Sequence, residues 1–508
     1  MPIEAGEDAI MRYPSNLARL TIGLLAIAVV IFIGGCGATS GTGDMSAKST
    51  GSETTSASSE GFADVSIGTT PLRAISPTFM GLSNEWGTSQ AMMGDSVSGV
   101  NEAYRQLIRN LMTYGSGPII LRIGGNSTDE SGEPTSTTIR PFVELANALD
   151  VHFYLGVNLA AGNVNLAMDQ AKDYINQMPK GSIDAIEIGN EPDQYPQKGY
   201  RKAPYTFENY LAEFNIWKEN IFPLLSGSTK LMGASWASPT MLSNIGPYDA
   251  AEASALATFS AHYYVANGLL NNPPDTLLTP IAATAGPKAV EAAVATSQQY
   301  HLPFRMGEMN SLYNGGGEGI SDAFGSALWA IDSMFEYVNI GVAGVNWQVG
   351  SDPSNPYNPF SITAKQTADV ASYTTTVNPL YYGLLFFQAA TGNKCHLLPV
   401  TLNTHANLKA WATIDNSGVI RLVLINKDEN ESGSVNIALG AYGHARIFRL
   451  TAPNYQSKTG ISFAGQTFDD SNDGFIHGNQ AVEDIDTTGG SFSISMPVIS
   501  AALMIFTK

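Results

Sequence analysis

The sequence predicts an α/β fold, a (β/α)8 TIM barrel with an accessory all-β sandwich domain formed by the C-terminal region plus an N-terminal strand. Between residues 76 and 392, short apolar runs alternate with amphipathic stretches of helical periodicity. This alternation is typical of parallel strands joined by crossover helices. Eight such units suit a closed barrel, which usually takes about 250 residues or more. After residue 392, strand-like segments follow one another through tight turns.

Residues 1–35 are predicted to be a lipoprotein-type signal peptide. Arg12 and Arg19 precede the apolar run at 20–35, and Cys36 follows it, which is the order of an export signal. The run Ile33-Gly34-Gly35-Cys36 resembles a bacterial lipobox, which implies lipidation at Cys36 and a lipid-anchored place in the bacterial cell envelope, periplasmic or at the surface. A plain signal peptide or a membrane anchor is the alternative, although the run is shorter than the ~20 residues that a span needs.

Two segments separate this signal from the barrel. Residues 36–61 are rich in Ser, Thr and Gly, a composition that cannot bury a core and predicts a flexible tether. Residues 62–75 are strand-like and are expected to pair into the C-terminal β domain.

The barrel domain is expected at 76–392. Its candidate strands are 77–84, 118–125, 152–159, 184–190, 230–236, 258–264, 303–310 and 342–349. Helical patterns are found at 100–114, 165–178, 207–224, 286–300, 320–338 and 378–391. The weakest connection is the one from the fifth strand to the sixth, because it begins with Pro and Ser.

The β-sandwich domain is expected at 393–508. LKAWATID and VIRLVLINK, separated by Asn-Ser-Gly, read as two strands of a hairpin, and ARIFRLTA and the terminal SFSISMPVISAALMIFTK also read as strands.

The charge and the histidine pattern exclude several classes of partner. The net charge is -19, which argues against nucleic acid and dense polyanions. The seven histidines show no metal-ligand spacing, and the glycines at 315–317 lack the Lys-Ser/Thr of a phosphate loop. The sequence therefore predicts no metal and no organic cofactor.

Two glutamates stand where a barrel places its chemistry. The active site of such a barrel lies at the C-terminal ends of its strands. The fourth candidate strand ends at Asn190-Glu191-Pro192 and the seventh at Glu308. Two carboxylates across one cleft suit glycosidic cleavage, because one donates a proton to the leaving oxygen while the other attacks the anomeric carbon or activates water.

With these motifs the chain resembles clan A of the glycoside hydrolases, and within it family 79, the β-glucuronidase and heparanase family. The residues that carry the resemblance are LRIGGNSTD (121–129), IEIGNEPD (186–193), AHYY (261–264), GEMNSLYNGGG (307–317) and NWQVG (346–350). The resemblance covers residues 76–392. It implies a retaining hydrolase with Glu191 as acid/base and Glu308 as nucleophile.

The same resemblance implies a set of substrate contacts. Asn190 would bind the sugar 2-hydroxyl, and Tyr263 would orient Glu308 through its hydroxyl. Gln348 would contact the sugar. The substrate carboxylate would lie near Tyr313, the backbone of Asn314 and Gly315, and Tyr357. Pro356 stands where the family has a glycine, and it has no N–H to donate.

Further residues are candidates from their positions on the strands or just after them. Asn126 and Asp129 are candidate sugar contacts, and so are Asn84 and Glu85 at the end of the first strand, although capping or loop closure explains such residues equally well. Arg122 is expected to organise the pocket carboxylates.

These features predict an exo-acting β-glucuronidase whose partner is a glucuronic-acid-containing glycan or glycoside, with any membrane contact through Cys36 alone. The alternatives are another clan A β-glycosidase, such as a β-glucosidase or β-xylosidase, and a non-catalytic glycan-binding lipoprotein. Endo action on sulfated chains is disfavoured, because it calls for a cleft rich in Lys and Arg. The oligomeric state is not predicted.

Overall fold

A computed structural model describes residues 62–95, 99–115, 117–238, 240–350, 352–366, 371–392 and 394–507. The predicted signal peptide (1–35), the lipidation site Cys36 and the tether (36–61) lie outside these residues. Within the described part of the chain, each helix is either too short or too polar to cross a bilayer.

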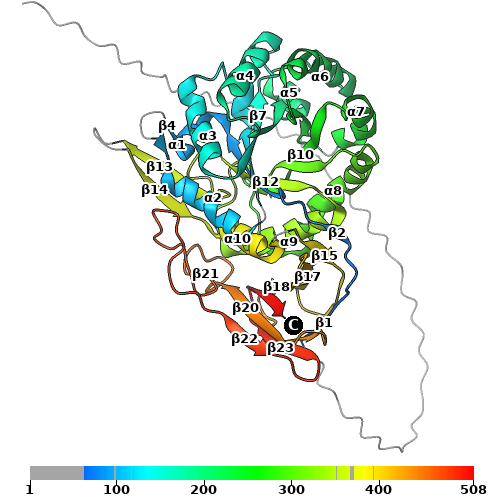
Figure 1. Ribbon diagram of the computed structural model, residues 1–508, viewed down its shortest axis with the longest axis vertical. Coiled ribbons are helices and arrows are strands. Elements are labelled where there is room, and N and C mark those ends of the chain that lie inside the picture. Colours follow the sequence, from blue (N-terminus) through cyan, green and yellow to red (C-terminus); the bar gives the residue numbers. More distant parts are fainter. Residues whose placement is uncertain are drawn as a thin grey trace, which may run out of the picture. The chain divides into compact units, whose positions relative to one another are not determined.

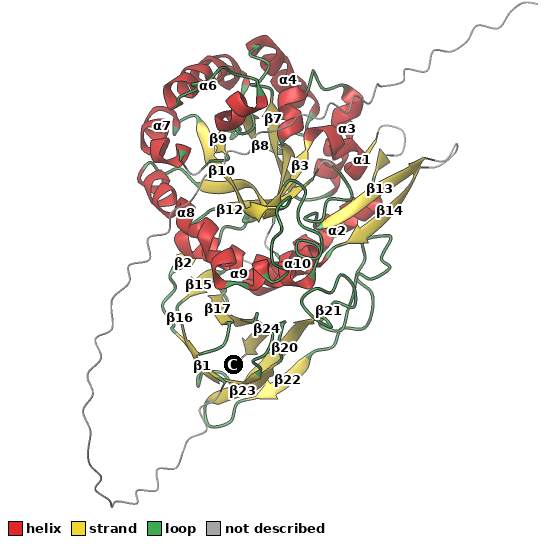
Figure 2. Cartoon of the chain, turned by 180° about the vertical axis from the view of Figure 1, so that it is seen from behind, coloured by secondary structure: helices red, strands yellow, loops and turns green. Residues whose placement is uncertain are grey.

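Eight parallel strands close into a barrel (Figures 1 and 2). In spatial order they are β10 (Leu256–Asn267), β11 (Phe304–Tyr313), β12 (Gly344–Val349), β3 (Met80–Glu85), β6 (Ile119–Gly124), β7 (Val151–Val157), β8 (Ile183–Ile188) and β9 (Lys230–Trp236). Every expected strand is present, and the predicted fold class is confirmed.

Helices surround this barrel (Figure 2). The longer ones are α2 (Glu102–Tyr114), α3 (Ser136–Ala148), α4 (Val164–Gln177), α6 (Phe207–Ile221), α7 (Ile245–Glu252), α8 (Pro280–Gln299), α9 (Phe324–Ile340) and α10 (Pro379–Thr391). Short turns of helix include α1 (Ser89–Met93) and α5 (Tyr195–Lys198).

Local sequence explains where several helices begin. Asn101 caps α2, because its side-chain oxygen accepts the N–H groups of Ala103 and Tyr104. Helix α3 is not among the helices named from the sequence; Thr135 and Thr138 form a capping box at its start, and Pro141 lies inside it. Helix α8 begins at Pro280, six residues before the predicted helix, because proline is well suited to the first turn.

A two-stranded hairpin between the eighth strand and α10 was also not expected. Its strands are β13 (Phe360–Gln366) and β14 (Ala371–Val377) (Figure 2). A further short pair joins β4 (Gly94–Asp95) to β5 (Gly99–Val100).

The remaining strands form two sheets. One sheet has the order β16 (Val400–Thr404), β1 (Ala63–Ile67), β19 (Gly433–Ala438), β23 (Ser491–Met496). The other has the order β2 (Arg73–Ala74), β15 (His396–Leu398), β17 (Leu408–Ile414), β18 (Ile420–Asn426), β24 (Ser500–Thr507), β20 (His444–Thr451), β21 (Ser462–Phe463), with β22 (Glu483–Asp486) paired to β20.

Apolar side chains from both sheets share one core, as in a sandwich. Buried residues alternate with exposed ones along β19 and β23, so each strand turns one face inward. Val65 of β1 and Leu424 of β18 belong to the same buried cluster. The N-terminal strand β1 pairs with β16 and β19, as predicted.

Polar contacts join helix α9 of the barrel to this β domain. The Asp332 carboxylate accepts from Lys427 Nζ at 2.7 Å and from Trp411 Nε1 at 3.0 Å. Both Asp332 and Lys427 are fully buried. A buried charge of this kind is tolerated only when it is paired.

Candidate active site

A cavity of about 760 Å³ opens at the C-terminal ends of the barrel strands. Its wall contains Glu191, which follows β8, and Glu308 on β11. Its other lining residues are Glu85, Asn126, Gln194, Gln197, Lys198, Ala237, His262, Tyr263, Tyr264, Tyr313, Asn314, Gly315, Gln348, Asn355 and Tyr357. The two predicted catalytic glutamates therefore face one another across one cavity.

Arg122 on β6 organises the floor of this cavity. It is fully buried, and its guanidinium donates to Glu187 Oε2 at 2.7 Å, Glu308 Oε2 at 2.9 Å and Asn190 Oδ1 at 2.7 Å. Burial disfavours its positive charge, but the carboxylates of Glu187 and Glu308 outweigh burial and raise the pKa of Arg122. Arg122 therefore holds the Glu308 side chain in a fixed orientation.

The second oxygen of Glu308 accepts a hydrogen bond from Tyr264. The Tyr264 hydroxyl lies 2.6 Å from Glu308 Oε1. Burial and the charge of Glu308 both raise the pKa of Tyr264 far above its usual value, so the hydroxyl keeps its proton and donates it. Both oxygens of Glu308 are thus engaged by donors, which fixes the orientation of the carboxylate.

The expectation that Tyr263 orients Glu308 is wrong. A Cβ placed on Gly286 of α8 would meet the Tyr263 ring at 2.7 Å, so this ring packs under the helix. Side chains alternate along a strand, and His262 and Tyr264 are the residues of β10 that reach the glutamates. The pairing of β10 with β11 shifts register between Ala261 and His262, so the facing of this segment is not set by its sequence alone.

Glu191 has a different environment from Glu308. Its Oε1 lies 3.1 Å from His262 Nδ1, and its Oε2 accepts from Lys198 Nζ at 3.2 Å. Burial opposes the charge of Glu191, but the contacts with His262 and Lys198 outweigh burial and lower its pKa to about 2. The backbone of Glu191 is left-handed, with φ 49°, a conformation that costs energy in a non-glycine residue and recurs at functional sites.

Glu85, rather than Asn84, faces the cavity at the end of β3. Glu85 accepts from the N–H and hydroxyl of Ser127, at 3.0 and 2.6 Å, and from Gln348 Nε2 at 3.0 Å. Burial, followed by the charge of Glu308, raises its pKa. Gly125 has φ 75°, and a Cβ there would overlap the Glu85 carboxylate. These contacts place a third carboxyl group beside the catalytic pair.

The predicted sugar contact at Asn84 is therefore wrong. Asn84 is fully buried, and its Oδ1 accepts from Tyr104 of α2 at 3.4 Å. Alternation along β3 sends Ser83 and Glu85 into the barrel and Asn84 outward.

The remaining predicted substrate contacts lie around the same cavity, but they differ in their exposure to solvent. Tyr313, Asn314, Gly315, Gln348, Tyr357 and Asn126 all line the cavity. Tyr313 is 44% exposed at the rim, whereas Tyr357 is buried. Gln348 Oε1 is buried and has no hydrogen-bond partner among the described residues, so a ligand hydroxyl would satisfy it.

Asn190 lies behind the cavity wall rather than in it. It is almost fully buried, and its amide nitrogen donates to Asn126 Oδ1 at 3.2 Å while its oxygen accepts from Arg122. Its amide nitrogen carries a second N–H, so these bonds do not exclude a contact with a sugar hydroxyl.

Ligand atoms of Glu191, His262 and Glu308 all lie within 4.8 Å of one another. Such a trio can in principle hold a metal ion. However, Lys198 and Arg122 already lie 3.2 and 2.9 Å from the two carboxylates, and their positive charges would repel a bound cation. The arrangement suits acid–base and nucleophilic chemistry better.

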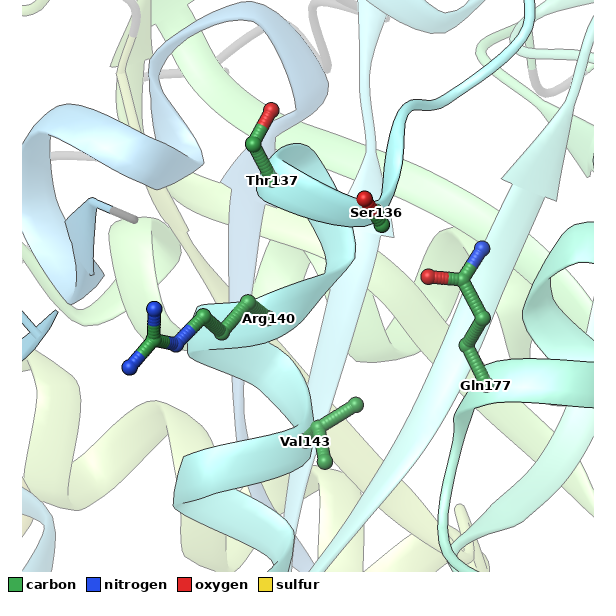
Figure 3. Close-up of a pocket in the computed structure, with 5 residues that line it drawn as sticks. All are labelled: Ser136, Thr137, Arg140, Val143 and Gln177. Atoms are coloured by element: carbon green, nitrogen blue, oxygen red, sulfur yellow. The ribbon is translucent and has the colours of Figure 1, made fainter. Parts of the chain in front are cut away.

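A second, shallower pocket lies away from the barrel mouth, beside helix α3 (Figure 3). Its lining residues are Ser136, Thr137, Arg140, Val143 and Gln177. Arg140 is already paired with Glu144 at 2.7 Å, and the pocket holds no acid–base pair.

Several site residues escaped sequence reasoning. Glu187, Lys198, Tyr264 and Asn355 all belong to the network or the cavity wall. Alternation along the strand was an available signal for Glu187, four residues before Glu191. Lys198 and Asn355 lie beyond the strand ends, where the alternation of a strand cannot predict which way a side chain points.

The chain is similar to known proteins in one of its domains and over longer stretches of its sequence. Residues 410–503 match the model of the glycosyl hydrolase family 79 C-terminal beta domain. A β-glucuronidase of Aspergillus niger is 24% identical over 298 residues, which cover 54% of this chain and 53% of that protein. A β-glucuronidase of Neurospora crassa is 22% identical over 419 residues, covering 70% of this chain and 73% of that protein. The chain thus spans about half the length of the Aspergillus relative.

Solved structures share the fold over nearly their whole length. A 4-O-α-L-rhamnosyl-β-D-glucuronidase from Fusarium oxysporum superimposes with a TM-score of 0.70 at 20% identity, covering 87% of this chain and 99% of that one. An arabinofuranosidase of family 51 from Xanthomonas axonopodis gives 0.64 at 13% identity, covering 88% and 100%. The matched β domain, the two relatives and the barrel-plus-sandwich fold together make this chain similar to the proteins of glycoside hydrolase family 79.

Proposed function

We propose that this protein is a retaining exo-β-glucuronidase, with Glu308 as nucleophile and Glu191 as acid/base. The observation that carries the proposal is the pairing of these side chains across one cavity, where a carboxylate oxygen of each lies within 4.8 Å of the other. Retaining glycosidases hold their carboxyl groups about 5–5.5 Å apart, whereas inverting ones need about 6.5–9.5 Å to admit a water.

In the first step, a Glu308 oxygen attacks the anomeric carbon while protonated Glu191 gives its proton to the glycosidic oxygen. The bond to the leaving group breaks and a covalent glycosyl–enzyme ester forms. In the second step, Glu191 takes a proton from water, the water oxygen attacks the anomeric carbon, and Glu308 is released as a carboxylate. The Arg122 and Tyr264 contacts hold the Glu308 carboxylate in position for its attack on the anomeric carbon.

The glucuronate preference is supported by the rim beside Glu308. Tyr313, Tyr357 and the backbone of Gly315 lie there with Asn355. The ring centroids of Tyr313 and Tyr357 are 6.3 and 6.2 Å from that of Tyr264. Hydroxyl, amide and N–H donors in this group suit a sugar carboxylate without a full positive charge. The β-glucuronidase relatives point to the same substrate.

A panel of p-nitrophenyl β-glycosides tests the substrate. We expect kcat/KM for the glucuronide to exceed that for the glucoside and the xyloside by at least about 100-fold, which corresponds to nearly 3 kcal/mol. Strong glucoside or xyloside cleavage with no glucuronide cleavage would overturn the substrate and leave the catalytic pair standing.

Azide rescue tests the two roles separately. With an activated aryl glucuronide, Glu308→Ala plus azide should give the α-glucuronyl azide, because azide replaces the nucleophile directly. Glu191→Ala plus azide should give the β-azide, because azide attacks the covalent intermediate from the opposite side. The reverse pattern of products would exchange the two roles.

We also propose that the protein is anchored in the bacterial envelope through a lipid on Cys36. This proposal rests on the sequence at 12–36. Cys36→Ser should abolish labelling by a radioactive fatty acid and move the protein out of the membrane fraction; unchanged labelling would contradict it.

A further inference from the structure

The two sides of the cavity carry different chemistry. Beside Glu308 lie three aromatic side chains, Tyr264, Tyr313 and Tyr357. Beside Glu191 lie amides and one amine. These polar groups are Asn126, Gln194, Gln197 and Lys198. Tyr263 also lines the cavity, and one edge of its ring lies against Gly286 of α8.

The reaction fixes which part of a substrate meets which side. The acid/base gives its proton to the glycosidic oxygen, so the leaving group is next to Glu191. The sugar that becomes attached to Glu308 occupies the aromatic side. The polar side therefore contacts the group that departs.

We propose that the segment from Gln194 to Lys198, together with Asn126, forms a leaving-group subsite that selects a neutral sugar over an aryl group, with Lys198 as its specificity-determining residue. The inference rests on the proposed function, because it takes Glu191 as the acid/base. It adds the chemical class of the leaving group.

The subsite is held in place before a substrate arrives. The Asp193 carboxylate accepts from the N–H groups of Ala237 and Ser238, at 3.0 and 2.8 Å. The Tyr195 hydroxyl donates to Asp129 Oδ1 at 2.7 Å. These contacts tie the segment to the loops after β9 and β6 on either side, so little ordering is needed on binding.

The number of cationic side chains in the cavity limits the kinds of leaving group that it can bind. Among the described residues that line the cavity, Lys198 is the one Lys or Arg. Its ammonium is shared between Glu191 Oε2 and Asn126 Oδ1, at 3.2 and 2.5 Å. One shared ammonium and three amides can bond the hydroxyls of a sugar, but they cannot neutralise a polysulfated chain. They also offer no stacking surface to an aryl ring.

The same contacts give the leaving group a part in catalysis. In the empty cavity Lys198 and His262 stabilise the charge of Glu191. A sugar hydroxyl that accepts from Lys198 draws the ammonium away from Oε2, which favours the protonated form that Glu191 needs as an acid. After the glycosidic oxygen takes that proton, the carboxylate and Lys198 can pair again. An aryl leaving group has no hydroxyl for this exchange.

The test compares two glucuronides in the full-length protein. One is p-nitrophenyl β-glucuronide and the other is a disaccharide with glucuronic acid β-linked to a neutral hexose. We expect Lys198→Met and Gln197→Ala each to lower kcat/KM for the disaccharide at least 10-fold more than they lower it for the aryl substrate. Lys202→Met, an exposed lysine outside the cavity, is the matched control and should change neither.

A second measurement separates sugar binding from tuning of Glu191. With the aryl glucuronide as donor, the covalent intermediate is shared between water and an added methyl hexoside. Both acceptors need Glu191 as a base, so altered acidity affects both routes. We expect Lys198→Met and Gln197→Ala to lower the ratio of transfer to hydrolysis at least 5-fold.

The outcomes are distinguishable. An unchanged transfer ratio, or equal losses of kcat/KM on both substrates, would overturn the leaving-group subsite while the glucuronidase stands. Wild-type protein that cleaves neither glucuronide would overturn the proposed function, and the inference would fall with it.

Discussion

Two arginines are buried inside the same barrel, and they are held by opposite kinds of partner. Arg122 lies at the C-terminal end beside the cavity and donates to the carboxylates of Glu187 and Glu308. Arg305 lies deeper and donates to neutral oxygens only, Asn346 Oδ1 at 2.5 Å and the carbonyls of Thr78, Phe79 and Val345. Its guanidinium also lies 5.5 Å from the Tyr154 ring centroid.

The difference teaches how to separate chemistry from structure in a barrel. Carboxylates raise the pKa of Arg122, whereas burial lowers the pKa of Arg305. A cation that fixes carboxylates at a cavity prepares a reaction. A cation that binds carbonyls at the closed end ties strands together, which fits the rule that this end of the barrel serves stability.

The largest expected effect comes from removing Glu308, the proposed nucleophile, from the cluster around Arg122. Glu308→Ala should lower kcat by about 10⁴-fold or more, since the nucleophile is lost. The melting temperature should fall little, because Arg122 keeps Glu187. Aryl-glycoside hydrolysis and thermal unfolding measure the two. Glu318→Ala, an exposed glutamate on the loop after Glu308, is the control and should retain full activity.

The Arg305 cluster should respond in the opposite way. Arg305→Met removes the donor that serves Asn346 Oδ1 and the Thr78 carbonyl. Each such loss costs about 1–3 kcal/mol, so the unfolding free energy should fall by at least about 2 kcal/mol. The kcat should stay within about 3-fold of wild type. A loss of kcat at unchanged stability would contradict the division between the two ends. Denaturant unfolding and steady-state kinetics give both values.

A pair of adjacent tyrosines sharpens the comparison at a single hydroxyl. Tyr264→Phe removes the second donor to Glu308, a hydrogen bond to a charged group worth about 1.5–3 kcal/mol. The kcat should therefore fall about 10- to 100-fold. Tyr263→Phe should leave kcat within about 2-fold, because its ring lies under α8. Equal losses in the two variants would show that the facing of β10 is misassigned.

The smallest effect concerns Asp129, a buried carboxyl whose direct partners carry no charge. Burial raises the pKa of Asp129 to about 7, against the Tyr195 hydrogen bond. The protonated form is thus favoured in the folded state. The carboxyl of Asp129 stabilises the folded state fully below pH 3.8, the ordinary pKa of an aspartate. This contribution to stability is lost as pH rises through about 7. In Asp129→Asn, the melting temperature should fall less over this pH range than it does in the wild type. The difference should correspond to on the order of 1–3 kcal/mol of unfolding free energy. If the melting temperatures of the two proteins fell in parallel, the raised pKa of Asp129 would be contradicted.

The sequence was a good guide wherever a local pattern was sufficient. Eight apolar runs predicted eight strands, and the ends of two of them located Glu191 and Glu308. The sequence did not predict which face of a strand a given side chain occupies. Asn84 and Glu85 were not told apart, and Tyr263 was chosen one position away from Tyr264; on a strand one position reverses the face. It also missed the partners of Glu191, because Lys198 and His262 come from different elements.

By itself, then, the sequence determined the fold class, the strand ends and the identity of the two glutamates, because periodicity and apolar burial act over a few neighbouring residues. Only the tertiary structure decided which side chains face the cavity and which cations contact Glu191 and Glu308. Barrel closure, the register shift between β10 and β11 and the turn after β8 set those facings. They arise from contacts between residues far apart in the chain, and such contacts leave no local pattern to read.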